Sequence, residues 1–355
     1  MTTLDLIVQS RIGLVDSLAE DHHHLTVVRR PSRSRLGTLR VYELAGDVLS
    51  LGRYHLAPNP SPPARDIRLF RRLSGGRVVP SGEGFVGVAL VLPHRSALVS
   101  ENPFALAPFQ VINRCVRGLL DACRLAGVSA HYPGRDLLTV QRRTLAMVSF
   151  EIDTAGAMLF EAVLANGADF SCAPARLDVV DPTGVVKAEL VTPDRATCFA
   201  TELGAALSIE EVADLVARGF MQQFGITVER RTLTALEQRA IKSASRHNVF
   251  GDRWLHQRVR RSELNLTGSE RTQLGCFEAF FALKQNRFIK DICFAGDFIA
   301  NSAAIDRLER ELRLCPAEWR AIDAVASDVL RAPENFILGI GPTRVIADTI
   351  CKGLA

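Results

Sequence analysis

The sequence predicts an α+β protein in two parts, a larger first part and a smaller second one. Short runs of apolar or alternating residues recur between residues 38 and 164, a pattern typical of strands. Segments with helical apolar spacing lie before, between and after these runs. A second pattern of one hairpin followed by helices comes after Trp254. We therefore expect one domain over residues 1–245 and a small α+β module over residues 246–355.

The expected elements of the first part begin with a helix over residues 3–20, where apolar side chains recur at roughly helical spacing. His22–His24 follow, and we expect them in a solvated loop. The later elements are strands at 38–43 and 48–54 with a turn at Gly46-Asp47, a proline-rich loop at 58–64, a helix over 109–125 ending near Gly127, strands at 136–140, 144–152 and 157–164, a covering segment at 172–207, and a helix from the capping box at Ser208 to Gly225.

The second part follows a charged helix predicted over residues 232–246. Its expected elements are a hairpin of 273–283 and 287–294 around Gln285-Asn286, helices over 302–313 and 316–330, a strand at 335–340, and a last helix from Pro342.

Composition excludes several classes of protein. Hydrophobic residues make up 47% of the 355 residues and charged residues 23%, so the chain can form a sizeable core. A net charge of +4 is too small to predict a nucleic-acid partner. The basic residues are mostly arginine, and the lysines are limited to Lys187, Lys242, Lys284, Lys290 and Lys352.

The eight cysteines form no C-x-x-C pair, so the sequence predicts neither a zinc ribbon nor a redox pair, and we assign no metal ligands. Most of them lie in apolar runs, which favours a reducing compartment. We see no secretory signal and no apolar run long enough to span a membrane. We therefore expect a cytoplasmic protein without a membrane partner.

A basic, glycine-rich stretch at Arg71–Pro80, followed by the apolar run Val86–Leu92, is the first candidate site. Glycines let the backbone approach a ligand, and their N–H groups with adjacent guanidinium groups suit an anion. The alternative is a basic turn in a hairpin. Because alternate strand residues face opposite ways, we expect one of Arg71 and Arg72 to face the site and the other to face solvent or an acidic partner.

The order of motifs resembles the lipoate–protein ligase family of the biotin/lipoate ligase superfamily. The motifs that carry the resemblance are Gly52-Arg53 after a strand pair, the Arg-Arg-x-Ser-Gly-Gly stretch at 71–76, Gly134-Arg135-Asp136-Leu137 after a helix, and a C-terminal hairpin at 274–298 that turns into Gly296-Asp297-Phe298. Together they cover roughly residues 38 to 350.

The resemblance implies a mixed β-sheet flanked by helices, with a small C-terminal α+β accessory domain. It implies ATP with Mg2+, lipoate or octanoate as the acid, an acyl-adenylate, and a lysine on a lipoyl carrier domain as acceptor. An apolar tunnel between sheet and loop would hold the acyl chain. The residues implied in binding are Arg53, Arg71, Arg72, Ser74, Gly75, Gly76, Arg77, Gly134, Arg135 and Asp136.

The sequence departs from the family where the family has a lysine that bridges the carboxylate and the α-phosphate. Thr144 stands at that position, between Arg143 and Leu145. Arg142 or Arg143 would supply charge there with a different geometry, and Lys187 would have to reach in from a loop. Two further segments match poorly, at residues 80–84 and 198–203.

Three functions therefore stay open. The first is an ATP-dependent ligase that uses Arg143, Thr144 or Lys187 at its centre. The second is a weak or inactive relative that binds an acyl chain, a nucleotide or a lipoyl carrier domain. The third is an octanoyl or lipoyl acyltransferase with a cysteine carrier, for which Cys172 is the candidate by its position in a loop.

Overall fold

The structure is a computed structural model that describes residues 3–28, 35–59, 67–247 and 249–354. Its larger part is built on a seven-stranded mixed sheet with the order β10-β1-β2-β6-β9-β8-β7. β1 runs parallel to β10 and β2, and the other neighbouring pairs run antiparallel. The strands are β1 (Thr3–Ile12), β2 (Arg35–Leu44), β6 (Phe85–Leu92), β7 (Leu137–Val140), β8 (Arg143–Ile152), β9 (Met158–Ala165) and β10 (Thr227–Arg230).

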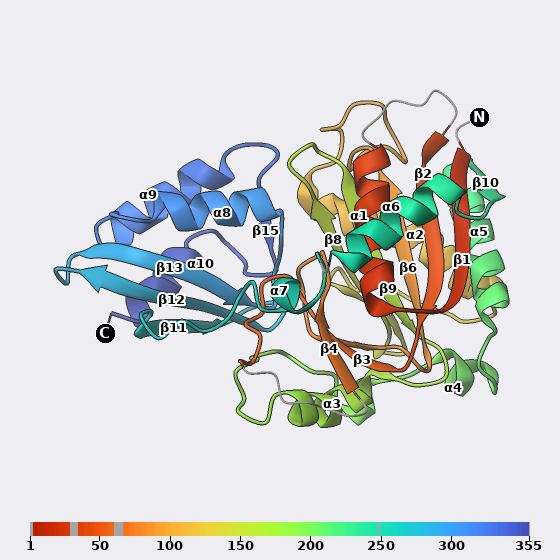
Figure 1. The fold of residues 1–355 in the computed structure, drawn as a ribbon, viewed down its shortest axis with the longest axis horizontal. Helices are drawn as coiled ribbons and strands as arrows, with labels where there is room; N and C mark the ends of the chain where they lie inside the picture. Colours follow the sequence, from red (N-terminus) through yellow and green to blue (C-terminus); the bar gives the residue numbers. More distant parts are fainter. Residues whose placement is uncertain (1–2, 29–34, 60–66, 248, 355) are drawn as a thin grey trace.

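Helices cover both faces of this sheet (Figure 1). α2 (Pro108–Leu125) and α5 (Ile209–Phe224) pack on one face, and α1 (Leu14–Val28) packs on the other with α6 (Ala235–Arg246) against it. The two faces alternate along each strand. Val41 of β2 lies in the core with α2 and α5, whereas the next residue, Tyr42, lies in the core with α1.

A second, three-stranded sheet with the order β4-β3-β5 carries the basic motif. β3 (Asp47–Leu51) lies between β4 (Ile67–Arg71) and β5 (Val79–Ser81). The segment after β9 covers this sheet with short helices and loops. These helices are η1 (Phe170–Cys172), α3 (Ala173–Val180), η2 (Pro193–Arg195) and α4 (Phe199–Leu203).

The C-terminal part has its own three-stranded antiparallel sheet, β11-β12-β13, drawn in blue-green in Figure 1. Its elements are α7 (Asp252–Leu255), β11 (Leu266–Arg271), β12 (Cys276–Lys284), β13 (Phe288–Gly296), β14 (Ile299–Ala300), α8 (Ser302–Glu311), α9 (Trp319–Leu330), β15 (Ile337–Leu338) and α10 (Val345–Lys352). The domain boundary near residue 245 stays a prediction, because hydrogen bonding between strands does not show that either part folds alone.

The predicted α+β class is confirmed, and most elements with strong local signals lie where the sequence predicts them. α2, β7, β8 and β9 match their predicted ranges to within a few residues. The Ser208 side chain caps α5 in a capping box with Glu211, and Gly225 ends the helix in the left-handed conformation. Gln285 and Asn286 form the turn between β12 and β13 with φ near 54° and 53°. The short strand β11 was not predicted.

The prediction for the N-terminus is wrong. Residues 3–12 form strand β1, and His22–His24 lie inside helix α1. β1 is an interior strand with side chains buried on both of its faces, including Leu6 and Ile7, so its apolar residues do not alternate as those of a half-exposed strand would. The proline-rich loop predicted at 58–64 lies largely outside the described residues.

The C-terminal part contacts the basic motif directly. The Gly76 N–H donates to the Phe298 carbonyl at 2.7 Å, and the Tyr54 hydroxyl donates to the Ala300 carbonyl at 2.9 Å. The Tyr54 ring also stacks on Phe298 with 4.5 Å between ring centroids. Glu151 of β8 accepts from the Ser302 N–H at 2.9 Å. Residues far apart in the sequence therefore fix the shape of the motif.

Arg71 lies at the centre of this junction and is fully buried. Its guanidinium group donates to backbone carbonyls on both sides. These acceptors are the carbonyls of Gly52 (3.2 Å), Arg53 (2.7 Å), His55 (2.7 Å), Leu255 (2.8 and 3.0 Å) and Arg258 (3.2 Å). Burial, together with the charges of Arg258 and Arg53, lowers the pKa of Arg71 to about 9. We expected one of the two arginines to face solvent or an acidic partner. This expectation is wrong, because Arg71 donates to backbone carbonyls in the interior.

We expect Arg71→Met to lower the free energy of unfolding by about 3 kcal/mol, because it leaves several buried carbonyls without a donor. Denaturant unfolding followed by circular dichroism measures this loss. Arg246→Met, which changes an exposed arginine of α6, is the control and should change the free energy by less than about 0.5 kcal/mol. Equal effects of the two substitutions would contradict the structural role of Arg71.

Candidate functional site

The basic motif forms a tight turn between β4 and β5. Gly76 has a φ of +82°, which favours glycine. A Cβ at Gly75 would lie 2.4 Å from the Phe298 carbonyl oxygen, so no side chain fits there. The turn thus needs both glycines for backbone reasons.

Arg72 follows Arg71 and points the opposite way, toward the interior between the two sheets. Its guanidinium group donates to the Gly75 carbonyl, to the Ser74 hydroxyl at 3.3 Å, and to the Ser50 carbonyl and hydroxyl at 3.4 Å. The Ser149 hydroxyl of β8 also donates to the Gly75 carbonyl, at 2.9 Å. Arg72 therefore stabilises the turn itself.

These contacts change the role expected for the glycine amides. The Gly76 N–H already donates to Phe298, and the Ser74 N–H donates to the Glu161 carboxylate at 3.0 Å. The Gly76 amide is therefore not free for a phosphate, against the expectation from the sequence.

A cavity of about 40 Å3 lies between the main sheet, helix α1 and the small β3–β5 sheet. The polar side chains on its wall are Ser17, Asp21, Tyr42, Ser50, Arg72, Arg77, Ser81, Asp136, Ser149 and Glu161, and the larger apolar ones are Leu18, Leu44, Phe70, Val79, Phe85, Met147, Val148 and Val163. An apolar tunnel was expected, and the wall is mostly apolar but also carries three carboxyl groups and two guanidinium groups.

Arg77 and Asp136 form a buried pair on this wall. Arg77 Nε donates to Asp136 Oδ2 at 2.7 Å, and the two side chains are 5% and 2% exposed. Burial raises the pKa of Asp136 even though Arg77 opposes the rise. One further atom of each side chain, Arg77 Nη2 and Asp136 Oδ1, is buried without a hydrogen-bond partner. Such atoms are costly unless a ligand or water satisfies them.

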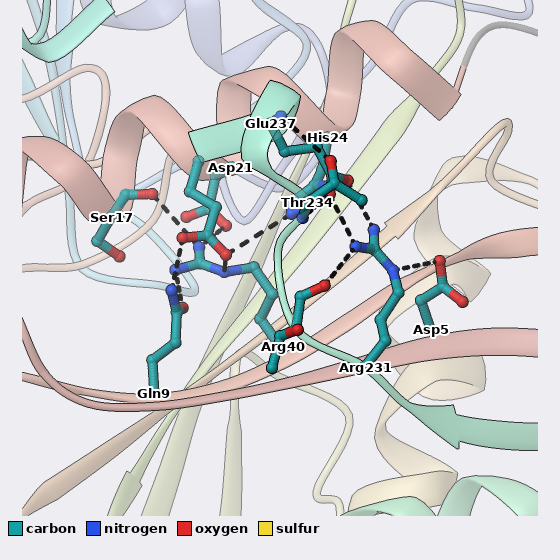
Figure 2. A network of polar contacts seen from close by, with 11 residues as sticks. Asp5, Gln9, Ser17, Asp21, His24, Arg40, Arg231, Thr234 and Glu237 are labelled. Atoms are coloured by element: carbon teal, nitrogen blue, oxygen red, sulfur yellow. Dashed lines mark hydrogen bonds and ion pairs between the residues drawn. The ribbon is translucent and has the colours of Figure 1, made fainter. Parts of the chain in front are cut away.

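A second buried network surrounds Arg40 on β2 and joins it to α1 (Figure 2). Arg40 Nε pairs with Glu20 at 2.8 Å, Nη1 pairs with Asp21, and Nη2 donates to Gln9 at 3.0 Å. Figure 2 also shows Arg231, which pairs with Asp5 at 2.7 Å and thereby joins the segment before α6 to β1. Arg40 thus holds two carboxylates of α1 against the sheet.

The pKa of Asp21 differs strongly from that of an ordinary aspartate. Burial raises the pKa to about 7 against the attraction of Arg40. The charges of Glu161 and Glu20 add to this rise. Burial alone would raise the pKa of Glu20 too, but Arg40 and hydrogen bonds from His24 and Gln9 lower it overall.

The other residues expected at the site do not line the cavity. Gly134 is exposed, Arg53 lies over the Trp254 ring at 5.1 Å, and Arg135 donates to the Gln273 carbonyl of the C-terminal part. The motif at 134–136 is therefore divided, because only Asp136 reaches the cavity wall.

The candidates for the missing lysine also lie away from the cavity. Thr144 is 4% exposed and pairs through its backbone with the segment at Ala196. Arg143 pairs with Glu202 at 2.9 Å, Arg142 is exposed on the β7–β8 turn, and Lys187 is exposed within electrostatic reach of Glu278. The β8 residues that line the cavity are instead Met147, Val148 and Ser149.

Cys172 is half-buried at the start of α3 and does not line the cavity. Burial raises its pKa even though Arg176 opposes the rise. Cys115 and Cys123 lie on the buried face of α2 in the core, as expected. Within the described residues, no group of three or more His, Cys, Asp or Glu side chains is arranged to hold a metal ion.

Sequence reasoning missed Asp21 and Glu161 as wall residues. Asp21 lay beyond the range of the wrongly predicted N-terminal helix. Glu161 gave a signal, because it is the one charged residue of the otherwise apolar strand β9. A lone charge in a central strand needs a buried partner or a ligand.

Comparisons with solved structures establish the fold. The chain matches P. falciparum LipL1, solved in complex with lipoate, with a TM-score of 0.66 and 13% identity over 99% of each chain. It matches lipoate-protein ligase A bound with ATP with a TM-score of 0.56 and 17% identity, over 72% of this chain and 99% of that one. A bi-partite lipoate protein ligase from Thermoplasma acidophilum, studied with its E2 lipoyl domain, matches with a TM-score of 0.53 and 16% identity over 72% and 97%.

The sequence matches no protein-family profile and no curated protein. The structural matches show that the chain has the biotin/lipoate ligase fold that its motifs predict. Their sequence identities are too low to assign an activity to the chain. Among the helices of the described chain, none is both long and apolar enough to cross a membrane.

The raised pKa of Asp21 predicts an unusual pH dependence of stability. The folded protein keeps the Asp21 proton up to about pH 7, whereas the unfolded chain releases it near pH 4. The folded state therefore binds more protons between these values, and the free energy of unfolding falls as pH rises. From pH 6 to pH 8 we expect this one group to lower it by about 1 kcal/mol.

Asp21→Asn should make that fall about 1 kcal/mol smaller, because the amide oxygen still accepts from Arg40 but does not titrate. Urea unfolding at pH 6 and pH 8 measures the difference. Asp16→Asn, on the same helix but exposed, should keep the wild-type pH dependence. An unchanged pH dependence in Asp21→Asn would show that Asp21 is ionised throughout this range.

Proposed function

We propose that the chain binds a small carboxylic acid in the cavity and activates it slowly in a lipoate ligase-like reaction with ATP. The observation that supports this is Arg77 Nη2, a buried guanidinium donor on the cavity wall that has no partner. A carboxylate is the natural acceptor for a guanidinium group. Arg77 is 5% exposed, so such a bond would form away from competing water.

The narrow cavity limits the shape of the acid. Its volume of about 40 Å3 is far below that of common ligand pockets, which measure roughly 300–1,000 Å3. An unbranched chain is favoured over a ring, and wall side chains must move to admit it. The lipoate in the structure of P. falciparum LipL1 is the reference acid for comparison.

In the proposed reaction, one carboxylate oxygen attacks the α-phosphorus of ATP and pyrophosphate leaves. The product is an acyl-adenylate. A carrier-protein lysine then attacks the acyl carbon, loses a proton and displaces AMP. We expect Mg2+ to arrive as the ATP complex, since Mg2+ is commonly held by substrate phosphates, and a lipoyl carrier domain of the kind studied with the T. acidophilum ligase is the proposed acceptor.

The reaction is proposed to be slow because no ammonium group lies where charge develops. Of the five lysines in the sequence, none lines the cavity within the described residues. The donors of Arg72 are occupied by the turn, and Arg143 is held by Glu202. A charge placed where negative charge develops typically contributes about 3–4 kcal/mol to the transition state.

A non-catalytic acid-binding relative is the second candidate. The occupied Gly76 N–H favours it, because a nucleotide phosphate would have to find other donors. ATP–pyrophosphate exchange separates the two candidates: a rate above background with any acid supports the ligase, whereas acid binding without exchange supports the binder.

The role of Arg77 is tested with the double variant Arg77→Gln and Asp136→Asn, which makes the pair neutral while keeping a hydrogen bond between the two side chains. We expect its affinity for hexanoate to fall at least about tenfold, the effect of losing one charge-assisted hydrogen bond. Calorimetry on the full chain measures this. An affinity for hexanoate that is unchanged in the double variant would show that the carboxylate does not bind at Arg77.

The position of Thr144 is tested with Thr144→Lys. If Thr144 stands where the family has its lysine, this change should raise pyrophosphate exchange by about 100-fold from a slow or absent wild-type rate. Thr139→Lys, at the residue paired with Thr144 across β7 and β8, is the control and should not raise it. Fast wild-type exchange that survives substitution of Arg142, Arg143 and Lys187 would show that the segment is misaligned.

A further inference from the structure

The cavity runs across the strands of the main sheet, and its charges are unevenly distributed along it. Tyr42 lies on β2, Glu161 on β9, Ser149 on β8, and Asp136 just before β7. Because the order of these strands is β2-β6-β9-β8-β7, the Arg77–Asp136 pair lies near one end and Asp21 with Tyr42 near the other. The backbones of β9, which carries Glu161, and β7, which follows Asp136, are about 10 Å apart, two strand spacings.

The α1 end carries one more carboxyl group than guanidinium groups. Glu20, Asp21 and Glu161 gather there with only Arg40 and Arg72. The neighbouring His24 does not supply a charge, because burial lowers its pKa. At the other end Arg77 and Asp136 balance each other. The extra carboxyl group therefore belongs to the wall formed by Asp21 and Glu161, where Asp21 carries a proton up to about pH 7 in place of a second positive partner.

One carboxylate oxygen of Glu161 accepts no hydrogen bond from the described residues. Glu161 is 8% exposed, Oε2 accepts from the Ser74 N–H, and no donor among the described residues reaches Oε1. Asp21 is 1% exposed and is bound only through Oδ1, by Arg40. Covering such oxygens with a hydrocarbon chain would cost free energy, because nothing replaces their hydration.

We infer that the acid bound in this cavity carries an amine at the end remote from its carboxylate, with the ammonium held between Glu161 and Asp21. An ammonium has donors for both oxygens, and its charge would favour the ionised form of Asp21. The ligand class is thus an unbranched amino acid with separated charges, its carboxylate at Arg77. This inference rests on the proposed function for the carboxylate end, and two independent features support it: the excess carboxylate at one end and the unpartnered Arg77 Nη2 at the other.

Three probes of equal chain length test the two ends separately: 6-aminohexanoate, hexanoate and hexylamine. Each is titrated into the full chain by calorimetry. We expect 6-aminohexanoate to bind at least about tenfold tighter than hexanoate, the effect of a charge-assisted hydrogen bond. Glu161→Gln should reduce this preference to near parity, and Asp21→Asn should reduce it as well. Glu210→Gln, at an exposed residue of α5, should keep it.

Each outcome decides one end of the ligand. Hexanoate or lipoate binding as tightly as 6-aminohexanoate overturns the amine while leaving the acid site. Hexylamine binding that is lost in Glu161→Gln, without binding of either acid, supports the amine and overturns the carboxylate at Arg77. A preference for 6-aminohexanoate that survives both Glu161→Gln and Asp21→Asn would show that the ammonium does not bind between these two residues. If no probe binds, both the ammonium site and the carboxylate site at Arg77 are contradicted. Circular dichroism confirms that each variant is folded, and Asp21→Asn carries the test if Glu161→Gln is not.

Discussion

The Phe298 carbonyl approaches the Gly75–Gly76 turn so closely that the backbone there has one available path. It accepts from the Gly76 N–H and leaves no room for a Cβ at Gly75. Once the turn follows that path, the Gly75 carbonyl faces Arg72 and Ser149. The turn that follows Arg72 is thus fixed by a contact between segments more than 200 residues apart, so the C-terminal part supports the site although none of its described residues lines the cavity.

Buried charge is the second constraint, and the two sheets manage it differently. Around Arg71 the charge is stabilised by backbone carbonyls, which are strong acceptors but neutral. Around Arg40 it is stabilised by carboxyl groups, and burial, together with the charges of Glu161 and Glu20, raises the pKa of Asp21. The first arrangement ties two parts of the chain together. The second leaves carboxylate oxygens facing a cavity, which is costly for stability and useful for recognition.

The sequence was informative where local rules decide the structure. The capping box of α5 and the turn of the β12–β13 hairpin depend on adjacent residues, and both lie where predicted. β1 was missed because an interior strand is apolar on both faces and lacks the alternation that identifies a half-exposed one. Strand alternation did place Arg71 and Arg72 on opposite sides. The sequence did not predict where the Arg71 side chain points, because its hydrogen-bond acceptors include residues as distant in the sequence as Leu255.

The residues that carried the resemblance to ligases serve mainly to build the turn. Arg71 and Arg72 have their donors occupied by the protein, and Ser74 and Gly76 have their N–H groups occupied. A sequence motif of this kind therefore identifies an architecture, and says little about which anion is bound. The buried side-chain atoms without a hydrogen-bond partner on this wall belong instead to Arg77 and Asp136, and Glu161 uses only Oε2 as an acceptor. Because an unsatisfied buried group costs stability in every molecule, its retention on a cavity wall is the stronger guide to what the cavity accepts.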